Sequence, residues 1–157
     1  MRKKLIKQTV ESMSPSDQNW LDLARLAQVE ITSENEAYPI ESALIPGAGP
    51  GWHAAQPGAQ TIRLLFDQPQ RLKRVYLIFH EAEQTRTQEF VLRWLPDGEE
   101  SFREIVRQQY NFSPPGTTRE IEDYKVELNE VSVLELRVVP DIGGGDARAK
   151  LEALRLA

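Results

Sequence analysis

The side chains that could recognise a ligand are a few aromatic, histidine, arginine, amide and carboxylate groups placed between runs of alternating apolar residues. An aromatic ring can lie against the apolar face of a sugar, and charged or amide groups can hydrogen-bond the sugar hydroxyls. The candidate ligand-binding residues are Trp52, His53, His80, Glu81, Arg86, Tyr110 and Asn111.

Three of these candidates have a simpler alternative. Trp52 could pack at the base of a loop, Arg86 could be a solvated surface charge, and Tyr110 could be a packing residue. Arg86 and Tyr110 are nevertheless the most useful probes of a ligand site. Because Arg86 lies between the polar residues Thr85 and Thr87, we expect its truncation to leave the core intact.

Catalytic patterns are incomplete in this chain. The run from His80 to Gln84 is similar to the zincin helix signature, but Gln84 replaces the second histidine and the only other histidine is His53. There is no cysteine, no phosphate-binding glycine loop followed by Lys and Ser or Thr, and no serine-hydrolase elbow. We therefore predict no catalytic residue, no metal site, no cofactor and no enzymatic activity.

Charge and hydropathy narrow the range of partners. The chain has 19 basic and 24 acidic residues, and its formal net charge is -5. Scattered Lys and Arg residues do not favour a nucleic-acid partner. No apolar stretch reaches the length of a membrane span, and no apolar segment follows the basic residues at the start. We expect a soluble, cytoplasmic protein, with a periplasmic location left open, whose partner is a carbohydrate or another protein.

The element pattern predicts a polar N-terminal arm over residues 1–19 and one domain over residues 20–157. Asn19 could cap a short helix within 20–27. Alternating apolar residues without intervening helical patterns then predict an antiparallel all-β sandwich. The expected strands lie near 29–31 and at 61–66, 75–79, 89–94, 124–128 and 133–139. Residues 146–156 are strong helix formers, but we predict a strand over 149–156 because sheet context often overrides propensity.

The order of these signals resembles the galactose-binding-like family of β-sandwiches, also called the discoidin or coagulation-factor type C family. The resemblance runs from Val29 to Leu156 and includes Tyr38-Pro39, Gly51-Trp52 and Asp97-Gly98. It implies an antiparallel jelly-roll sandwich and a non-catalytic binding role, with carbohydrate as the ligand. A protein-interaction or assembly domain is the alternative.

This chain departs from the family pattern where many relatives hold a structural calcium ion. The loop at 44–50 lacks the usual Asp-Gly, and Ala153 stands where the family usually has a glutamate. Calcium needs six to eight oxygen ligands, so we expect no calcium site here.

Strand parity separates the connections into two groups. Short turns at 67–71, 96–99 and 128–131 should fall at one end of the sandwich. The longer loops, at 46–59, 80–87, 108–120 and 140–148, should gather at the other end. Because a rigid sandwich fixes such loops, we predict that the ligand binds at the end with the longer loops.

Overall fold

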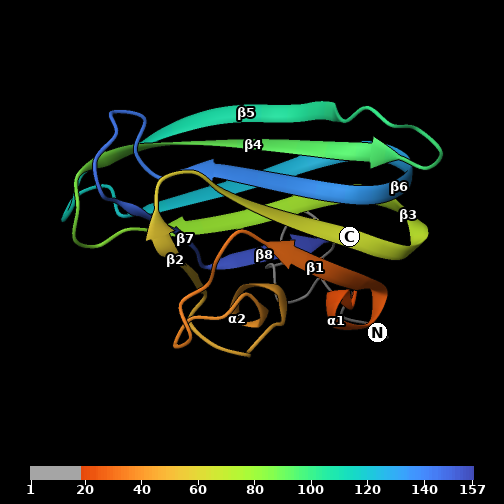
Figure 1. Ribbon diagram of the computed structural model, residues 1–157, viewed down its shortest axis with the longest axis horizontal. Coiled ribbons are helices and arrows are strands. Elements are labelled where there is room, and N and C mark those ends of the chain that lie inside the picture. The colour runs from red at the N-terminus through yellow and green to blue at the C-terminus, as the bar shows by residue number, and fades with distance from the viewer. Residues whose placement is uncertain (1–18) are drawn as a thin grey trace, which may run out of the picture.

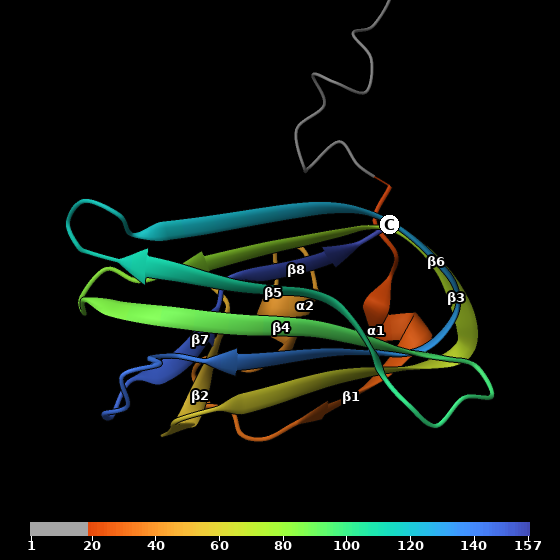
Figure 2. The same ribbon diagram turned by 90° about the horizontal axis from the view of Figure 1, so that it is seen from above.

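The two long strands β3 (Gln60–His80) and β6 (Arg119–Val139) pair antiparallel and bend together, so each contributes to both layers of a sandwich (Figure 2). In this computed structural model, which describes residues 19–157, one sheet has the strand order β1-β3-β6-β4-β5. The flanking strands are β1 (Ala27–Ile31), β4 (Arg86–Pro96) and β5 (Arg103–Phe112). β1 therefore lies at one margin of the first layer and β5 at the other.

The second layer consists of the later part of β3, the earlier part of β6 and the strand β8 (Ala153–Leu156), which pairs with β3 over Val75–Ile78. A separate two-stranded sheet pairs β2 (Trp52–Pro57) with β7 (Arg148–Leu151). Two single-turn helices, α1 (Leu23–Leu26) and α2 (Glu41–Leu44), lie beside β1 (Figure 1).

The bend in β3 has a local cause. The pairing of β3 with β6 shifts register between Leu65 and Arg74, a stretch that contains Pro69. Because proline has no backbone N–H, it cannot continue a hydrogen-bonded ladder. On β6, Glu130 has a φ of 57°, which turns that strand at the corresponding point. The two strands therefore change direction together and cross from one layer to the other.

The core lies between the two layers and follows the alternation of the strands. Ile62, Leu64 and Phe66 point inward from β3, whereas Thr61, Arg63 and Leu65 lie on its outer side. The largest fully buried apolar side chains include Trp52, Phe79, Phe90, Phe112, Leu72, Leu77, Leu92, Leu134, Leu136 and Leu151. Both layers thus contribute to a single hydrophobic core.

Most of the expected elements are confirmed. The antiparallel sandwich, the short N-terminal helix and the strand character of 149–156 are present, the last divided into β7 and β8 at Glu152. The helix is shorter than expected. Its N-cap position is Asp22 rather than Asn19, and no side-chain cap hydrogen bond forms there. No helix within residues 19–157 is long and apolar enough to cross a membrane.

Several expected connections are wrong. Residues 67–71 and 128–131 are bends within continuous strands rather than turns between strands. The expected loop at 46–59 contains β2, and the expected loop at 108–120 is shortened because β5 extends to Phe112 and β6 begins at Arg119. The predicted arm at 1–19 lies outside the described residues apart from Asn19.

Candidate functional site

A pocket of about 230 Å³ opens where four chain segments meet. They are the stretch at Tyr38, the start of β2 with Pro50 before it, the residues at and just after the end of β3, and the corner between β7 and β8. The sandwich end that holds this pocket is called the loop end below. It is the end where β3 gives way to β4, β5 to β6 and β6 to β7 (Figure 2). The pocket side chains used in the argument are Tyr38, His53, His80, Glu83, Lys150 and Glu152.

The pocket wall depends on a close approach of two backbones at Gly51. Gly51 has a φ of 124°, and a Cβ atom there would lie 2.6 Å from the carbonyl oxygen of Leu151. Only glycine combines that conformation with that approach. The following residue, Trp52, is fully buried and donates from Nε1 to the Ser33 carbonyl at 3.0 Å. Trp52 therefore packs at the base of the pocket, in agreement with the packing alternative, and its ring is not exposed for stacking on a ligand.

Tyr38 and His53 form the aromatic part of the pocket. Their ring centroids are 3.8 Å apart and their planes differ by 9°, so the two rings are stacked. The His53 backbone N–H donates to the Tyr38 carbonyl at 3.1 Å, which holds the two residues together. Burial, followed by the nearby charge of Lys150, lowers the pKa of His53 below its usual 6.5. The imidazole is therefore neutral at pH 7 and can both donate and accept a hydrogen bond.

A buried ion pair lies beneath the pocket. Arg86 Nε donates to Glu81 Oε1 at 2.8 Å, and both side chains are 1% exposed. Lys150 Nζ lies 3.5 Å from Glu81 Oε2 and extends the pair toward the pocket. Burial opposes ionisation of Glu81, but bonds from Arg86 and from the backbone N–H groups of Glu83 and Gln84 lower the pKa of Glu81 to about 2. Glu81 therefore remains ionised and orients Lys150.

The polar network continues into the core from Arg86. Arg86 Nη1 donates to the Pro140 carbonyl at 2.7 Å and to Gln88 Oε1 at 3.2 Å. Gln88 in turn donates to Glu120 Oε1 at 3.1 Å. Burial, followed by the neighbouring Glu122, raises the pKa of Glu120 to about 8, so Glu120 is protonated at pH 7. These contacts tie β4 and β6 together directly behind the pocket.

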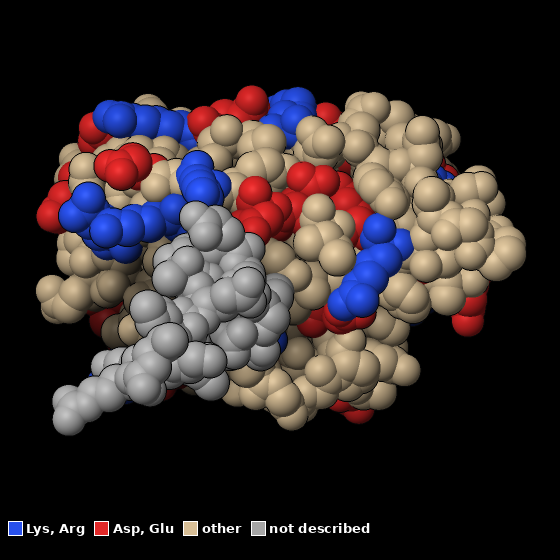
Figure 3. Space-filling model, turned by 180° about the vertical axis from the view of Figure 1, so that it is seen from behind, with Lys and Arg blue, Asp and Glu red and all other residues tan. Residues whose placement is uncertain are grey.

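An exposed ion pair forms part of the rim. Arg119 Nη2 lies 2.9 Å from Glu152 Oε2, and the Tyr110 hydroxyl donates to the Arg119 carbonyl at 2.9 Å. Lys150 supplies a hydrogen-bond donor to the pocket, whereas Glu83 and Glu152 supply acceptors. Charges of both signs are also intermixed on the face of the molecule shown in Figure 3. The pocket therefore offers both donors and acceptors to a polar ligand.

The seven predicted ligand-binding residues have different positions in the structure. His53, His80 and the fully buried Trp52 line the pocket, while Glu81 is buried behind the lining residues. Tyr110 and Asn111 are on β5, where Asn111 Oδ1 accepts a hydrogen bond from Thr87 at 2.7 Å; neither lines the pocket. Their proposed role in ligand binding stays a prediction.

Arg86 requires a correction, because the expected surface charge is 3% exposed. Its polar sequence neighbours were therefore a misleading guide to its exposure. Thr85 lies before β4, and Arg86, the first residue of β4, points inward in the alternation of the strand. Truncation of Arg86 is consequently expected to disturb the core.

Tyr38, Lys150 and Glu152 were missed as site residues. Tyr38 belongs to the Tyr-Pro pair that carries part of the family resemblance, which was the available signal. Lys150 pairs with His53 across β7 and β2, a contact that follows only from the strand pairing. Within residues 19–157, no group of three or more His, Cys, Asp or Glu side chains is arranged to hold a metal ion.

Neither a protein-family model nor a curated protein sequence matches the chain. Solved structures do match in fold. One is a family 32 carbohydrate-binding module of Clostridium perfringens NanJ in complex with galactose, with a TM-score of 0.60, 12% identity and coverage of 83% of this chain and 92% of that module. Another is the Clostridium perfringens module CpGH89CBM32-5 in complex with GalNAc-β-1,3-galactose, with a TM-score of 0.57, 18% identity and coverage of 83% and 94%.

A Ruminococcus gnavus GH29 fucosidase in complex with fucose is also similar, with a TM-score of 0.61 and 9% identity. The match covers 87% of this chain but only 26% of the fucosidase. These similarities establish the galactose-binding-like β-sandwich fold, the fold of family 32 carbohydrate-binding modules.

Proposed function

We propose that the chain is a non-catalytic module that binds carbohydrate in the pocket lined by Tyr38, His53, His80 and Lys150. The observation that carries the proposal is the convergence of a stacked aromatic pair with donors and acceptors in one concave site. Sugar recognition requires both an apolar platform and polar groups directed at hydroxyls. The likeness in fold to modules solved with sugars supports the same conclusion.

The size of the pocket favours a short ligand. At about 230 Å³ it is smaller than the roughly 300–1,000 Å³ typical of sites for drug-sized molecules. A terminal sugar or a disaccharide unit fits this space better than several consecutive units of a chain.

The charge states of the nearby carboxyl groups favour binding over hydrolysis. A glycosidase needs a carboxylic acid with a raised pKa beside the scissile bond. Among the described residues, Glu120 is the carboxyl group whose pKa is raised, but it is 1% exposed and does not line the pocket. Glu81, which is closer, stays ionised with a pKa of about 2.

A glycan-array screen of the full chain, followed by calorimetric titration with galactose and with the strongest array ligand, tests the proposal. Tyr38→Ala and Lys150→Gln should each lower the affinity for the ligand by roughly tenfold, which is the scale of one lost stacking contact or one charged hydrogen bond. Tyr38→Phe keeps the aromatic face and should retain most of the affinity.

Gln109→Ala is the matched control, because Gln109 is exposed on β5, lies outside the pocket and is not one of the candidate ligand-binding residues. It should bind like the unmodified protein, and every variant should remain folded in thermal melts. Failure of every array glycan to bind would overturn the proposal. So would binding that Gln109→Ala abolishes and Tyr38→Ala leaves intact.

A further inference from the structure

The open margin of the first layer, at β1, is separate from the pocket at the loop end. β1 pairs with β3 on one side only. Thr32 N–H donates to the Thr61 carbonyl at 3.0 Å, which makes this position a hydrogen-bonded pair of the ladder. Since such pairs alternate along an antiparallel ladder, the N–H and C=O groups of Val29 and Ile31 face away from β3. Within residues 19–157, no backbone partner meets them.

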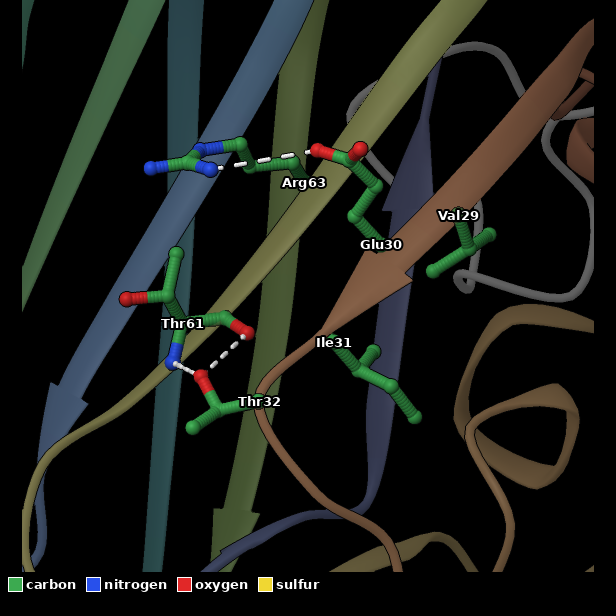
Figure 4. A pocket seen from close by; sticks show the side chains of 6 residues that line it. All are labelled: Val29, Glu30, Ile31, Thr32, Thr61 and Arg63. Atoms are coloured by element: carbon green, nitrogen blue, oxygen red, sulfur yellow. Dashed lines mark hydrogen bonds and ion pairs between the residues drawn. The ribbon is translucent and has the colours of Figure 1, made fainter.

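Two hollows follow this edge, one on each side of β1. A hollow of about 630 Å³ is lined by Glu30, Thr32, Thr61 and Arg63 together with Val29 and Ile31 (Figure 4). The second, of about 480 Å³, lies between β1 and the two helices and is lined mostly by apolar residues, with Glu34 and Glu41 also on its wall. It also includes Val29 and Ile31, so the edge of β1 separates the two spaces. Successive side chains of a strand added at this edge would enter the two hollows alternately.

A row of alternating charges crosses the outer face of the sheet and ends at this edge. Glu30, Arg63, Glu135 and Arg93 are register partners on the adjacent strands β1, β3, β6 and β4. Arg63 and Arg93 both contact Glu135, with Nε to carboxylate distances of 2.8 Å. Glu30 is more loosely held, with 3.8 Å between its carboxylate and Arg63 Nη1, and its side chain is 53% exposed.

We propose that the β1 edge binds an extended peptide of a partner protein in which a basic residue alternates with apolar residues. The peptide would pair with the outward backbone groups of Val29 and Ile31. Its basic side chain would continue the charge row beside Glu30, and its apolar side chains would enter the hollow next to α1 and α2. Main-chain bonds would supply affinity, and the alternate side chains would supply specificity.

Pairing with a second copy of β1 satisfies these features less well. An antiparallel pair centred on Val29 places Gln28 opposite Glu30, and a pair centred on Glu30 places two glutamates opposite each other. The first leaves the terminal charge without a counter-ion, and the second is repulsive. A basic peptide provides the missing charge.

The test uses two acetylated, amidated heptapeptides, Thr-Val-Lys-Val-Lys-Val-Thr and Thr-Val-Glu-Val-Glu-Val-Thr, titrated into the full chain at low salt. Amide NMR should show the lysine peptide perturbing Val29 and Ile31, with about five- to thirtyfold tighter binding than the glutamate peptide. Glu30→Lys should reverse that preference. Glu100→Lys, which changes an exposed charge on the β4–β5 connection, is the matched control and should not alter it.

Val29→Pro removes one outward N–H donor without removing a bond to β3, and it should weaken both peptides. Equal binding of the two peptides by the unmodified chain, or an unchanged preference in Glu30→Lys, would refute the proposal. Protection of the Val29 and Ile31 amides from exchange without peptide would also refute it. In a monomer, protection would show that another segment of this chain fills the edge, and in a dimer it would show self-pairing.

Discussion

The loop end of the sandwich differs from the opposite end, where β3 and β6 bend and which is called the bend end below. The two ends differ in the kinds of residue that are buried there. At the bend end, β3 and β6 pass from one layer to the other without interruption, and the buried residues there include Leu72 and Val131. At the loop end the strands are interrupted by connections, and the buried residues include Arg86, Glu81 and Glu120. At the loop end, a network of buried charges and hydrogen bonds joins the segments.

This difference accounts for where the pocket lies. Connections can carry varied side chains without disturbing a ladder, whereas a continuous bent strand leaves no room for a separate recognition loop. The buried ion pair also holds Lys150, the register partner of His53, through Glu81. The loop end therefore combines a buried polar network with apolar packing around Trp52, Phe79 and Phe112, whereas Leu72 and Val131 at the bend are buried apolar residues.

The largest effect on stability is expected from Arg86→Met. Removing the guanidinium leaves Glu81 charged, buried and short of its main partner, so we expect a loss of about 3–5 kcal/mol in the free energy of unfolding. Urea denaturation at pH 7 measures it. Arg93→Met is the matched control. Its side chain is 41% exposed and Glu135 keeps Arg63, so the expected loss is only about 1 kcal/mol. Equal losses in the two variants would show that the buried network of the loop end contributes no more than a partly exposed arginine does.

At the bend end, Leu72→Ala should cost about 2–4 kcal/mol through lost burial and a residual cavity, because Leu72 is fully buried. The loss should be the same at pH 5 and pH 8, because an apolar truncation does not alter a titrating group. Urea denaturation at both values tests this. A loss that changes by more than about 1 kcal/mol between them would show that the bend end is coupled to buried charges.

The sequence was sufficient for the fold because the information is local and periodic. Ile62, Leu64 and Phe66 alternate on β3 as expected, and the resemblance from Tyr38-Pro39 onward matches the observed order of elements. The bends could not be distinguished from turns, because Pro69 and its polar neighbours give the same signal in a turn between strands and in a bend within one.

The candidate site was predictable only in part. His53 and His80 could be placed at the loop end by strand parity, and both line the pocket. The partners of Arg86 could not be inferred, because Pro140 is 54 residues away along the chain. The pairing of Lys150 with His53 depends on β2 and β7, and β2 was expected to be part of a loop. Contacts between segments that are distant in the sequence therefore could not be predicted from the sequence.

A smaller effect is expected at Glu120, which belongs to the network of the loop end. Its folded-state pKa of about 8 exceeds the usual 4.5 of an unfolded glutamate. The stability gained from the protonated form is present below pH 4.5 and is lost as the pH rises through 8. The side chain in Glu120→Gln cannot ionise. Between pH 5 and pH 9 the free energy of unfolding should therefore fall in this variant by less than in the unmodified protein, with a difference of at least about 1 kcal/mol. Parallel pH profiles of the two proteins, measured by urea denaturation, would contradict this assignment.

The smallest expected effect concerns His53, which reports on the electrostatics of the pocket itself. Burial is the main cause of its lowered pKa, and the charge of Lys150 is the second. Lys150→Gln should therefore raise the pKa of His53 while leaving it below 6.5, because burial still disfavours the imidazolium. Below pH 6.5 His53 is more readily protonated in the unfolded chain than in the folded protein. The free energy of unfolding should therefore fall slightly as the pH drops below 6.5. NMR titration of the ring protons measures the midpoint, and Lys125→Gln, on an exposed position of β6, is the control. An unchanged midpoint in Lys150→Gln, or an equal shift in Lys125→Gln, would show that Lys150 does not act on the aromatic pair as the loop-end network implies.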